Sequence, residues 1–159
     1  MRTLILGLGN KLMQDDALGV LAVEALQESY HFPGGVRLVD GGTLGLDLLP
    51  QLEDVDRLLI IDALDMKSEP GSVFRLEGEE VPRAFAAKLS IHQMGVQDLL
   101  ALAELRGHLP AELVVWGAQP EAIEMGLELT PVLRTSFEKV LDGVVGELTA
   151  WGQPPARAA

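Results

Sequence analysis

The sequence predicts an α/β fold, a three-layer α/β/α sandwich around a mostly parallel, twisted sheet of about five strands. Nearly continuous aliphatic runs at residues 3–8 and 58–61 are typical of parallel strands that are covered on both faces. Amphipathic helical patterns separate such runs along the chain, and this alternation favours a parallel sheet. We expect residues 1–152 to form a single domain and residues 153–159 a flexible C-terminal tail.

The expected strands stop where turn residues begin. The first, at residues 3–8, runs into Gly7 and Gly9, which favour a tight turn. Further short apolar runs predict strands at residues 36–39, 58–61, 72–76 and 113–116. The segment between the third and fifth of these strands is the least regular part of the pattern, with a short helix expected to start near Glu79 and Glu80.

The expected helices follow a 3.6-residue apolar period. One spans residues 18–30 and is preceded by Asp15 and Asp16, either of which can cap it. A short helical stretch at residues 46–52 contains Pro50, which should distort it. Another helix runs from residue 95 to about residue 107. The last begins at Thr130, an N-cap residue followed by a proline.

Composition excludes several classes of protein. The 159 residues include no cysteine, so no disulfide framework exists, and 24 acidic against 12 basic residues give a net charge of −12. Phosphate backbones would be repelled, so we expect no nucleic-acid partner. No apolar run approaches a membrane span or a signal peptide, which favours a cytoplasmic protein. A monomer is expected, because no extended apolar stripe lacks a role in the core.

Three polar side chains stand where loops meet predicted strands or helices. Asp16 and Asp62 follow predicted strands, and His92 lies in the loop before the next helix. In open parallel sheets the functional groups gather beyond the carboxyl ends of the strands, so these side chains can converge. A histidine near a helix N-terminus tends to stay neutral, with a lone pair available for a cation. Two carboxylates and one imidazole suit zinc, nickel or a similar divalent ion.

Local sequence alone leaves simpler interpretations open. Asp16 is equally suited to capping a helix, and Asp62 to bonding a loop amide. A single histidine in a loop is more often solvated than a metal ligand. No short metal signature such as H-E-x-x-H is present.

Other chemistries fit less well. The segment at residues 7–12 begins like a dinucleotide fingerprint, but Leu12 stands where the third glycine is needed. The chain has no cysteine nucleophile, no serine in a G-x-S-x-G elbow and no phosphate-binding G-K-[ST]. These absences argue against an ordinary serine or cysteine hydrolase, and no organic cofactor is expected.

Several motifs, in order along nearly the whole chain, resemble the hydrogenase maturation endopeptidases, which process the large subunit of nickel-iron hydrogenases. They are Leu6-Gly7-Leu8-Gly9-Asn10, Asp15-Asp16-Ala17-Leu18-Gly19, Asp40-Gly41-Gly42-Thr43, Ile61-Asp62-Ala63, Glu80-Val81-Pro82, Ser90-Ile91-His92-Gln93-Met94-Gly95 and Gly117-Ala118-Gln119-Pro120-Glu121.

The resemblance implies an α/β sandwich with aspartyl endopeptidase activity and assigns the metal-contacting and catalytic trio to Asp16, Asp62 and His92. It also implies that nickel arrives with the substrate, a hydrogenase large-subunit precursor whose C-terminal extension is removed after nickel insertion. Asp40, Gly41 and Gly42 are candidates for a loop that the precursor's backbone approaches. A tight turn closed by Asp40 explains that loop equally well.

Two other functions stay open at this point. A non-proteolytic chaperone or sensor that grips nickel would share the trio and leave the precursor uncut. A peptidyl-tRNA hydrolase would share the opening Gly-Leu-Gly-Asn segment, but the histidine and arginine motif of that family is missing and the acidic charge opposes tRNA.

Overall fold

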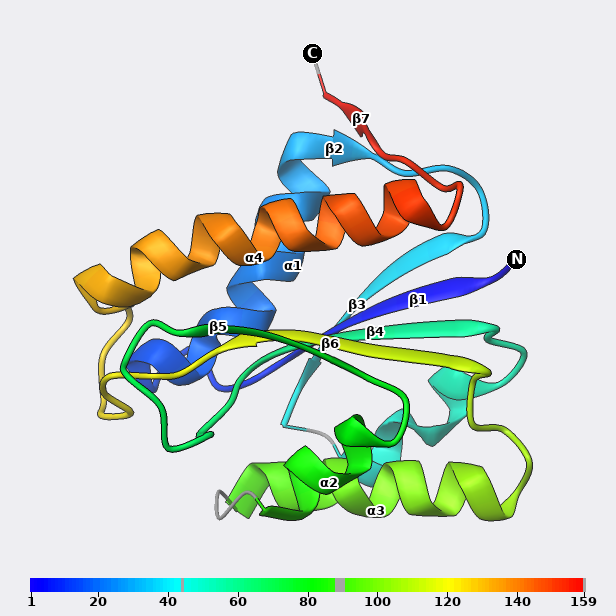
Figure 1. Ribbon diagram of the computed structural model, residues 1–159, viewed down its shortest axis with the longest axis horizontal. Coiled ribbons are helices and arrows are strands. Elements are labelled where there is room, and N and C mark those ends of the chain that lie inside the picture. Colours follow the sequence, from blue (N-terminus) through cyan, green and yellow to red (C-terminus); the bar gives the residue numbers. More distant parts are fainter. Residues whose placement is uncertain (44, 88–90, 159) are drawn as a thin grey trace.

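A computed structural model describes residues 1–43, 45–87 and 91–158, together with their side chains except those of residues 45, 46, 86, 87 and 91–97. Its main feature is a five-stranded sheet with the strand order β3-β1-β4-β6-β5 (Figure 1). The strands are β1 (Thr3–Leu8), β3 (Val36–Gly42), β4 (Arg57–Ala63), β5 (Val73–Glu77) and β6 (Glu112–Ala118). All neighbours are parallel except β5 and β6, which pair antiparallel. The predicted fold class is thus confirmed, and all five expected strands are present.

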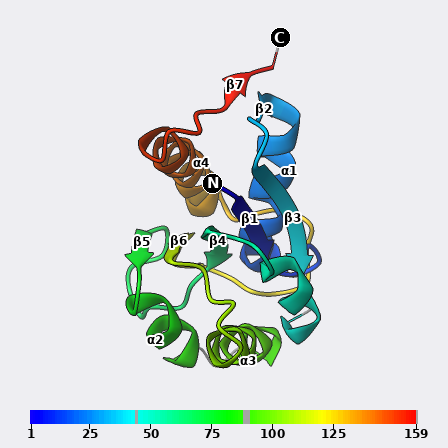
Figure 2. The same ribbon diagram turned by 90° about the vertical axis from the view of Figure 1, so that its right-hand side faces the viewer.

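Helices cover both faces of the sheet (Figure 2). One face carries α1 (Leu18–Ser29) and α4 (Pro131–Ala150). The other carries the 3-10 helix η2 (Gly45–Leu52), α2 (Glu80–Ala87) and α3 (Ile91–Leu105). Each face has its own apolar core, because successive strand side chains point to opposite sides.

This alternation also sets the direction of Asp62. In β4, Leu58 and Ile60 belong to the core under α2 and α3, whereas Leu59 and Ile61 belong to the core under α1 and α4. Asp62 continues the first set, so its side chain is directed to the face that α3 covers. One more residue of offset would turn it to the other face.

The side chains that were expected to cap α1 and α4 make no capping hydrogen bonds. Ala17 is the N-cap of α1, with no side-chain cap bond, so neither Asp15 nor Asp16 caps this helix. The two aspartates lie instead in the short 3-10 turn η1 (Gln14–Ala17). Thr130 does occupy the N-cap position of α4, followed by Pro131, but its hydroxyl makes no cap bond. It donates to the Asp15 carboxylate at 2.8 Å.

The start of α3 also differs from the prediction. The sequence pattern places His92 in a loop, with the helix starting near residue 95. In the structure α3 begins at Ile91, so His92 belongs to the first helical turn. The pattern misses this turn because the early positions of a helix need not carry the apolar period. No helix in the part of the chain that the structure describes is long and apolar enough to cross a membrane.

The C-terminal tail makes specific contacts. Strand β7 (Ala156–Arg157) pairs antiparallel with β2 (Tyr30–His31). The Gln153 side chain also donates to the Met1 carbonyl at 3.0 Å. These contacts connect the tail to both ends of the fold, which its composition did not indicate. The division into one domain and a flexible tail stays a prediction.

Candidate functional site

The two predicted carboxylates lie at the carboxyl end of the central strands. Asp16 follows β1 in the turn η1, and Asp62 is the penultimate residue of β4. Strands β1 and β4 are neighbours whose last paired residues are Gly7 and Ile61, and η1 packs against β4. Asp16 is 1% and Asp62 0% exposed, so both carboxylates are buried. The structure therefore brings these two residues to the same end of the sheet.

Two glycines permit this close arrangement. A Cβ atom on Gly9 would lie 1.8 Å from the Asp16 carbonyl oxygen, and Gly9 has a φ of +133°. A Cβ atom on Gly19 would lie 2.0 Å from the carbonyl oxygen of Ile61, the residue before Asp62. Any side chain at either position would push the η1 turn and the start of α1 off the sheet. Gly9 of the Gly-Leu-Gly segment is thus required for backbone packing.

The Asp16 side chain is held by the turn after β1. The Asn10 backbone N–H donates to Asp16 Oδ2 at 3.0 Å. This bond fixes one carboxylate oxygen relative to the end of β1. The function expected of Asp16 requires such a fixed position, because a metal ligand is useful only in a defined geometry.

Asp15, next to it, has a structural role that the sequence did not reveal. It is fully buried and accepts hydrogen bonds from the backbone N–H groups of Glu121, Ala122 and Thr130 at 2.8–3.1 Å. The Thr130 hydroxyl donates to it as well. Asp15 therefore ties the η1 turn to the loop between β6 and α4. Local sequence could not separate its role from that of Asp16, since both are acids before a helix.

Gln119 performs a similar task beside Asp62. Its Oε1 accepts bonds from the backbone N–H groups of Met66 and Ser68 at 2.8 and 3.2 Å, and its Nε2 donates to Asp65 at 3.2 Å. The side chain is 7% exposed. The loop that leaves β4 after Asp62 is thereby fastened to the end of β6. Gln119 belongs to the motif at residues 117–121, but no role was predicted for it from the sequence.

The side chain of His92 lies outside the described residues. Its backbone belongs to the first turn of α3, which begins on the side of the molecule where β1 and β4 end (Figure 1). Asp62 is directed to the face that α3 covers. The convergence of His92 with the two carboxylates thus stays a prediction. Among the side chains that the structure does describe, no three His, Cys, Asp or Glu residues gather as a metal site.

The candidate substrate loop borders a shallow hollow of about 260 Å³. Asp40 Oδ1 accepts the backbone N–H of Gly42 at 2.9 Å, which is the tight turn expected as the alternative. Gly41 is buried, and a Cβ atom there would lie 2.8 Å from Leu6 Cδ1. Internal packing accounts for this glycine. The hollow is lined by Gly9, Asn10, Lys11, Val20, Asp40, Gly42 and Thr43.

Lys11 keeps a positive charge at the rim of this hollow. A hydrogen bond to Glu24 raises the pKa of the Lys11 ammonium above its usual value, and the charge of Asp40 acts in the same direction. Burial opposes the shift. The hollow next to Asp16 therefore presents both a cation and the Asp40 carboxylate to a ligand.

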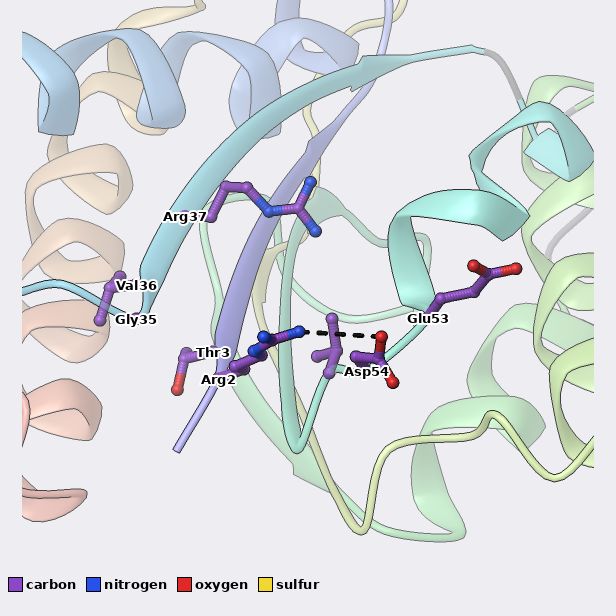
Figure 3. A pocket seen from close by; sticks show the side chains of 8 residues that line it. Arg2, Thr3, Gly35, Val36, Arg37, Glu53 and Asp54 are labelled. Atoms are coloured by element: carbon purple, nitrogen blue, oxygen red, sulfur yellow. Dashed lines mark ion pairs between the residues drawn. The ribbon is translucent and has the colours of Figure 1, made fainter.

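Two more hollows are present in the described part of the chain. One of about 520 Å³ lies between α2 and the loop after β4 and is lined by Asp65, Met66, Lys67, Leu76, Glu80, Arg83 and Ala84. The other, of about 340 Å³, lies at the opposite end of the sheet, where Arg2, Arg37, Glu53 and Asp54 surround the start of β1 (Figure 3). The first hollow adjoins the loop that follows Asp62, whereas the second lies at the amino ends of β1 and β3.

Carboxylates at the carboxyl end of the central strands can bind a cation that a substrate carries. They are poorly suited to nucleophilic catalysis through serine or cysteine, because the chain supplies no cysteine and no nucleophile elbow at this end. The geometry thus favours chemistry in which a metal polarises the reacting group.

Comparisons with known proteins identify the family of the chain. The family model "HycI: Hydrogenase maturation protease" matches residues 20–147. The hydrogenase 2 maturation protease of Escherichia coli is 40% identical over 153 residues, covering 96% of this chain and 93% of that protein. The hydrogenase expression/formation protein HupD of Rhodobacter capsulatus is also 40% identical, over 95% of this chain and 73% of its own.

Solved structures give the same result. The hydrogenase maturating endopeptidase HybD from E. coli superposes with a TM-score of 0.95 at 39% identity, covering 99% of this chain and 98% of its own. The [NiFe] hydrogenase maturation protease HybD from Thermococcus kodakarensis gives a TM-score of 0.75 at 34% identity, over 91% and 97% of the two chains. From its sequence and its fold, the chain belongs to the hydrogenase maturation protease family.

Proposed function

We propose that this hydrogenase maturation endopeptidase, which processes the large subunit of a nickel-iron hydrogenase, removes the C-terminal extension of the precursor only after nickel insertion. In this proposal Asp16, Asp62 and His92 recognise the nickel that the substrate carries. The observation that carries it is the burial of Asp16 and Asp62 together at the carboxyl end of β1 and β4.

A substrate-borne ion explains why the site offers so few ligands. Two carboxylates and one imidazole leave coordination positions open, and the precursor's own ligands fill them. Contact with nickel then places the scissile peptide beside the buried carboxylates. Selectivity for the loaded precursor follows, because a precursor without the ion offers the two carboxylates no metal to bind.

Bond cleavage in this scheme depends on the metal. Nickel polarises the scissile carbonyl or activates a water molecule, and both variants remain part of the proposal. A carboxylate bound to a metal is a weak base, so neither Asp16 nor Asp62 is assigned as a strong general base. Their role is to hold the ion and orient the peptide next to it.

Asp40 and the turn at Gly41 and Gly42 form the side of the site where the precursor's backbone enters. The Asp40 side chain closes this turn by accepting the Gly42 N–H, and Asp40 and Gly42 also line the hollow beside Asn10. We propose that the extension passes over this hollow. A monomeric, cytoplasmic protein without an organic cofactor is the accompanying prediction.

The proposal is tested by incubating the purified protein with the large-subunit precursor, with and without inserted nickel, and following the mass of the precursor. We expect loss of the C-terminal extension only from the nickel-loaded form. If only the nickel-free precursor is cleaved, nickel recognition is overturned. A stable complex with an uncut, nickel-loaded precursor would instead favour the chaperone.

A further inference from the structure

Four large apolar side chains project into solvent next to the turn that carries Asp16. We name them the docking patch; its members and their exposed fractions are Leu12 (57%), Ile123 (43%), Met125 (85%) and Leu127 (73%). They come from two segments far apart in the sequence. These segments are seen at the left of Figure 1, where the loop between β6 and α4 lies beside the η1 turn.

Backbone hydrogen bonds fasten the two segments to each other. The Gly126 N–H donates to the Leu12 carbonyl at 2.9 Å, and the Gln14 N–H donates to the Gly126 carbonyl at 3.0 Å. The Asp15 N–H donates to the Ala122 carbonyl at 3.2 Å. With the bonds that the buried Asp15 carboxylate accepts from this loop, the patch is preformed. Binding it therefore requires little ordering of the loop, which favours association.

Exposure of these side chains is not explained by the fold. Clustered exposed apolar side chains commonly mark interaction sites. Only two other large apolar residues in the described part of the chain are strongly exposed, Met1 and Leu105. Both lie outside this cluster.

The docking patch is continuous with the candidate site. The Leu12 N–H donates to Asn10 Oδ1 at 2.9 Å, and the Asn10 N–H donates to the Asp16 carboxylate. Asn10 and Lys11 also line the hollow beside Asp40. A protein whose scissile peptide reaches Asp16 must therefore lie against, or directly beside, the patch.

The rim of the patch is acidic. Glu121, Glu124 and Glu128 are exposed in the same loop, and Glu128 is paired only with the exposed Arg134 at 3.3 Å. The whole chain carries a net charge of −12. A partner that fits this surface has an apolar centre bordered by lysine or arginine, since complementary rim charges guide association and orientation.

We infer that the docking patch binds the folded body of the hydrogenase large-subunit precursor, through an apolar surface with a basic border. This inference rests on the proposed function, because it takes the precursor as the substrate. It adds that recognition has two parts. The buried carboxylates recognise nickel, and the patch supplies the contact area that a single ion cannot supply.

The test compares wild type with the double variant Met125→Ser/Leu127→Ser on nickel-loaded precursor. We expect KM to rise about 10-fold or more with kcat nearly unchanged, because the patch binds the substrate outside the reacting atoms. The matched control is Leu105→Ser, whose side chain is 85% exposed, as Met125 is, at the far end of α3. It should leave both constants unchanged.

A pull-down of the precursor by each variant separates this inference from the proposed function. If wild type cuts the precursor and the double variant cuts and binds it equally well, the docking inference is overturned while the function stands. If wild type does not cut, the proposed function fails, and loss of precursor binding in the double variant still supports the patch. A change in sedimentation of the protein alone, without any effect on precursor binding, identifies a second copy as the occupant and overturns the inference.

Discussion

The two ends of the sheet both carry charged residues but bury them differently. At the amino end, a hollow of about 340 Å³ is bordered by Arg2 and Asp54, which form an ion pair at 3.7 Å with 70% and 82% of their side chains exposed (Figure 3). At the carboxyl end, a hollow of about 260 Å³ is lined by Asn10, whose N–H donates to Asp16, and Asp16 is 1% exposed. Exposed pairs of the first kind contribute about 0–1 kcal/mol and tolerate substitution.

The difference teaches that a hollow bordered by charged residues does not by itself mark the functional end, because both ends of the sheet have one. What separates the ends is burial of carboxylates, since charge taken out of water is costly unless something compensates it. At the carboxyl end three carboxylates are buried despite this cost, those of Asp15, Asp16 and Asp62.

The largest effect is expected for Asp62→Asn. The amide keeps the shape of the carboxylate but removes its charge, and we expect the processing rate to fall by about 1000-fold, as for the loss of a metal-binding group in a catalytic site. The measurement is the conversion of nickel-loaded precursor, followed by mass spectrometry. His92→Ala should lose processing to a similar degree.

The control for this prediction is Asp54→Asn at the amino end, where the side chain is 82% exposed. It should process the precursor at the wild-type rate. Circular dichroism must show that the Asp62→Asn protein is folded. A folded Asp62→Asn protein with normal processing would remove Asp62 from the site.

The next effect concerns the backbone that supports Asp16. Gly9→Ala is expected to lower the free energy of unfolding by about 3 kcal/mol, because the new methyl group collides with a carbonyl at a strained φ. Gly34→Ala, in the turn before β3 at the amino end, has no atom within 4 Å of the added Cβ. Urea titration should show no loss for it. Equal stability of the two variants would contradict the close packing of η1 on β1.

Asp15→Ala tests the connection between η1 and the loop before α4. It leaves three backbone N–H groups without their acceptor, so we expect a loss of about 2–3 kcal/mol in the free energy of unfolding. The comparison is Asp56→Ala at the amino end, where an exposed carboxylate accepts one bond, from the Arg2 N–H at 2.8 Å. That variant should lose less than about 1 kcal/mol. A larger loss at Asp56 would reverse the comparison between the ends.

The smallest effect is expected for Asp16→Glu. Glutamate keeps a carboxylate at this position and only lengthens the side chain, so processing should remain within about 10-fold of wild type. The rate on nickel-loaded precursor measures it. An inactive but folded Asp16→Glu protein would show that the bond from Asn10 demands the shorter side chain.

Much of the fold could be predicted because it depends on local patterns. The aliphatic runs gave the strands and their shared edge, since apolar period and turn residues act over short distances. Asp16 and Asp62 were placed at that edge by the same reasoning. The first turn of α3 was missed, because nothing in the apolar period distinguishes Ile91 and His92 from a loop.

Roles that depend on distant partners could not be predicted from local sequence. Asp15 bonds to residues more than 100 positions away, and Gln119 to a loop more than 50 positions away. From the sequence, Asp15 was interpreted as a possible helix cap, and Gln119 only as part of a motif. The exposure of Leu12, Met125 and Leu127 was missed for the same reason, since apolar residues in loops carry no period that shows which way they face.

The most direct test of the central claim is X-ray absorption at the nickel edge of the loaded precursor, frozen with the protein before cleavage is complete. If Asp16, Asp62 and His92 bind the ion, the spectrum should gain oxygen or nitrogen neighbours at about 2.1 Å, a distance typical of carboxylate and imidazole ligands on divalent transition metals. The Asp62→Asn protein should give a reduced gain. A nickel spectrum identical with and without the wild-type protein would contradict recognition through these residues.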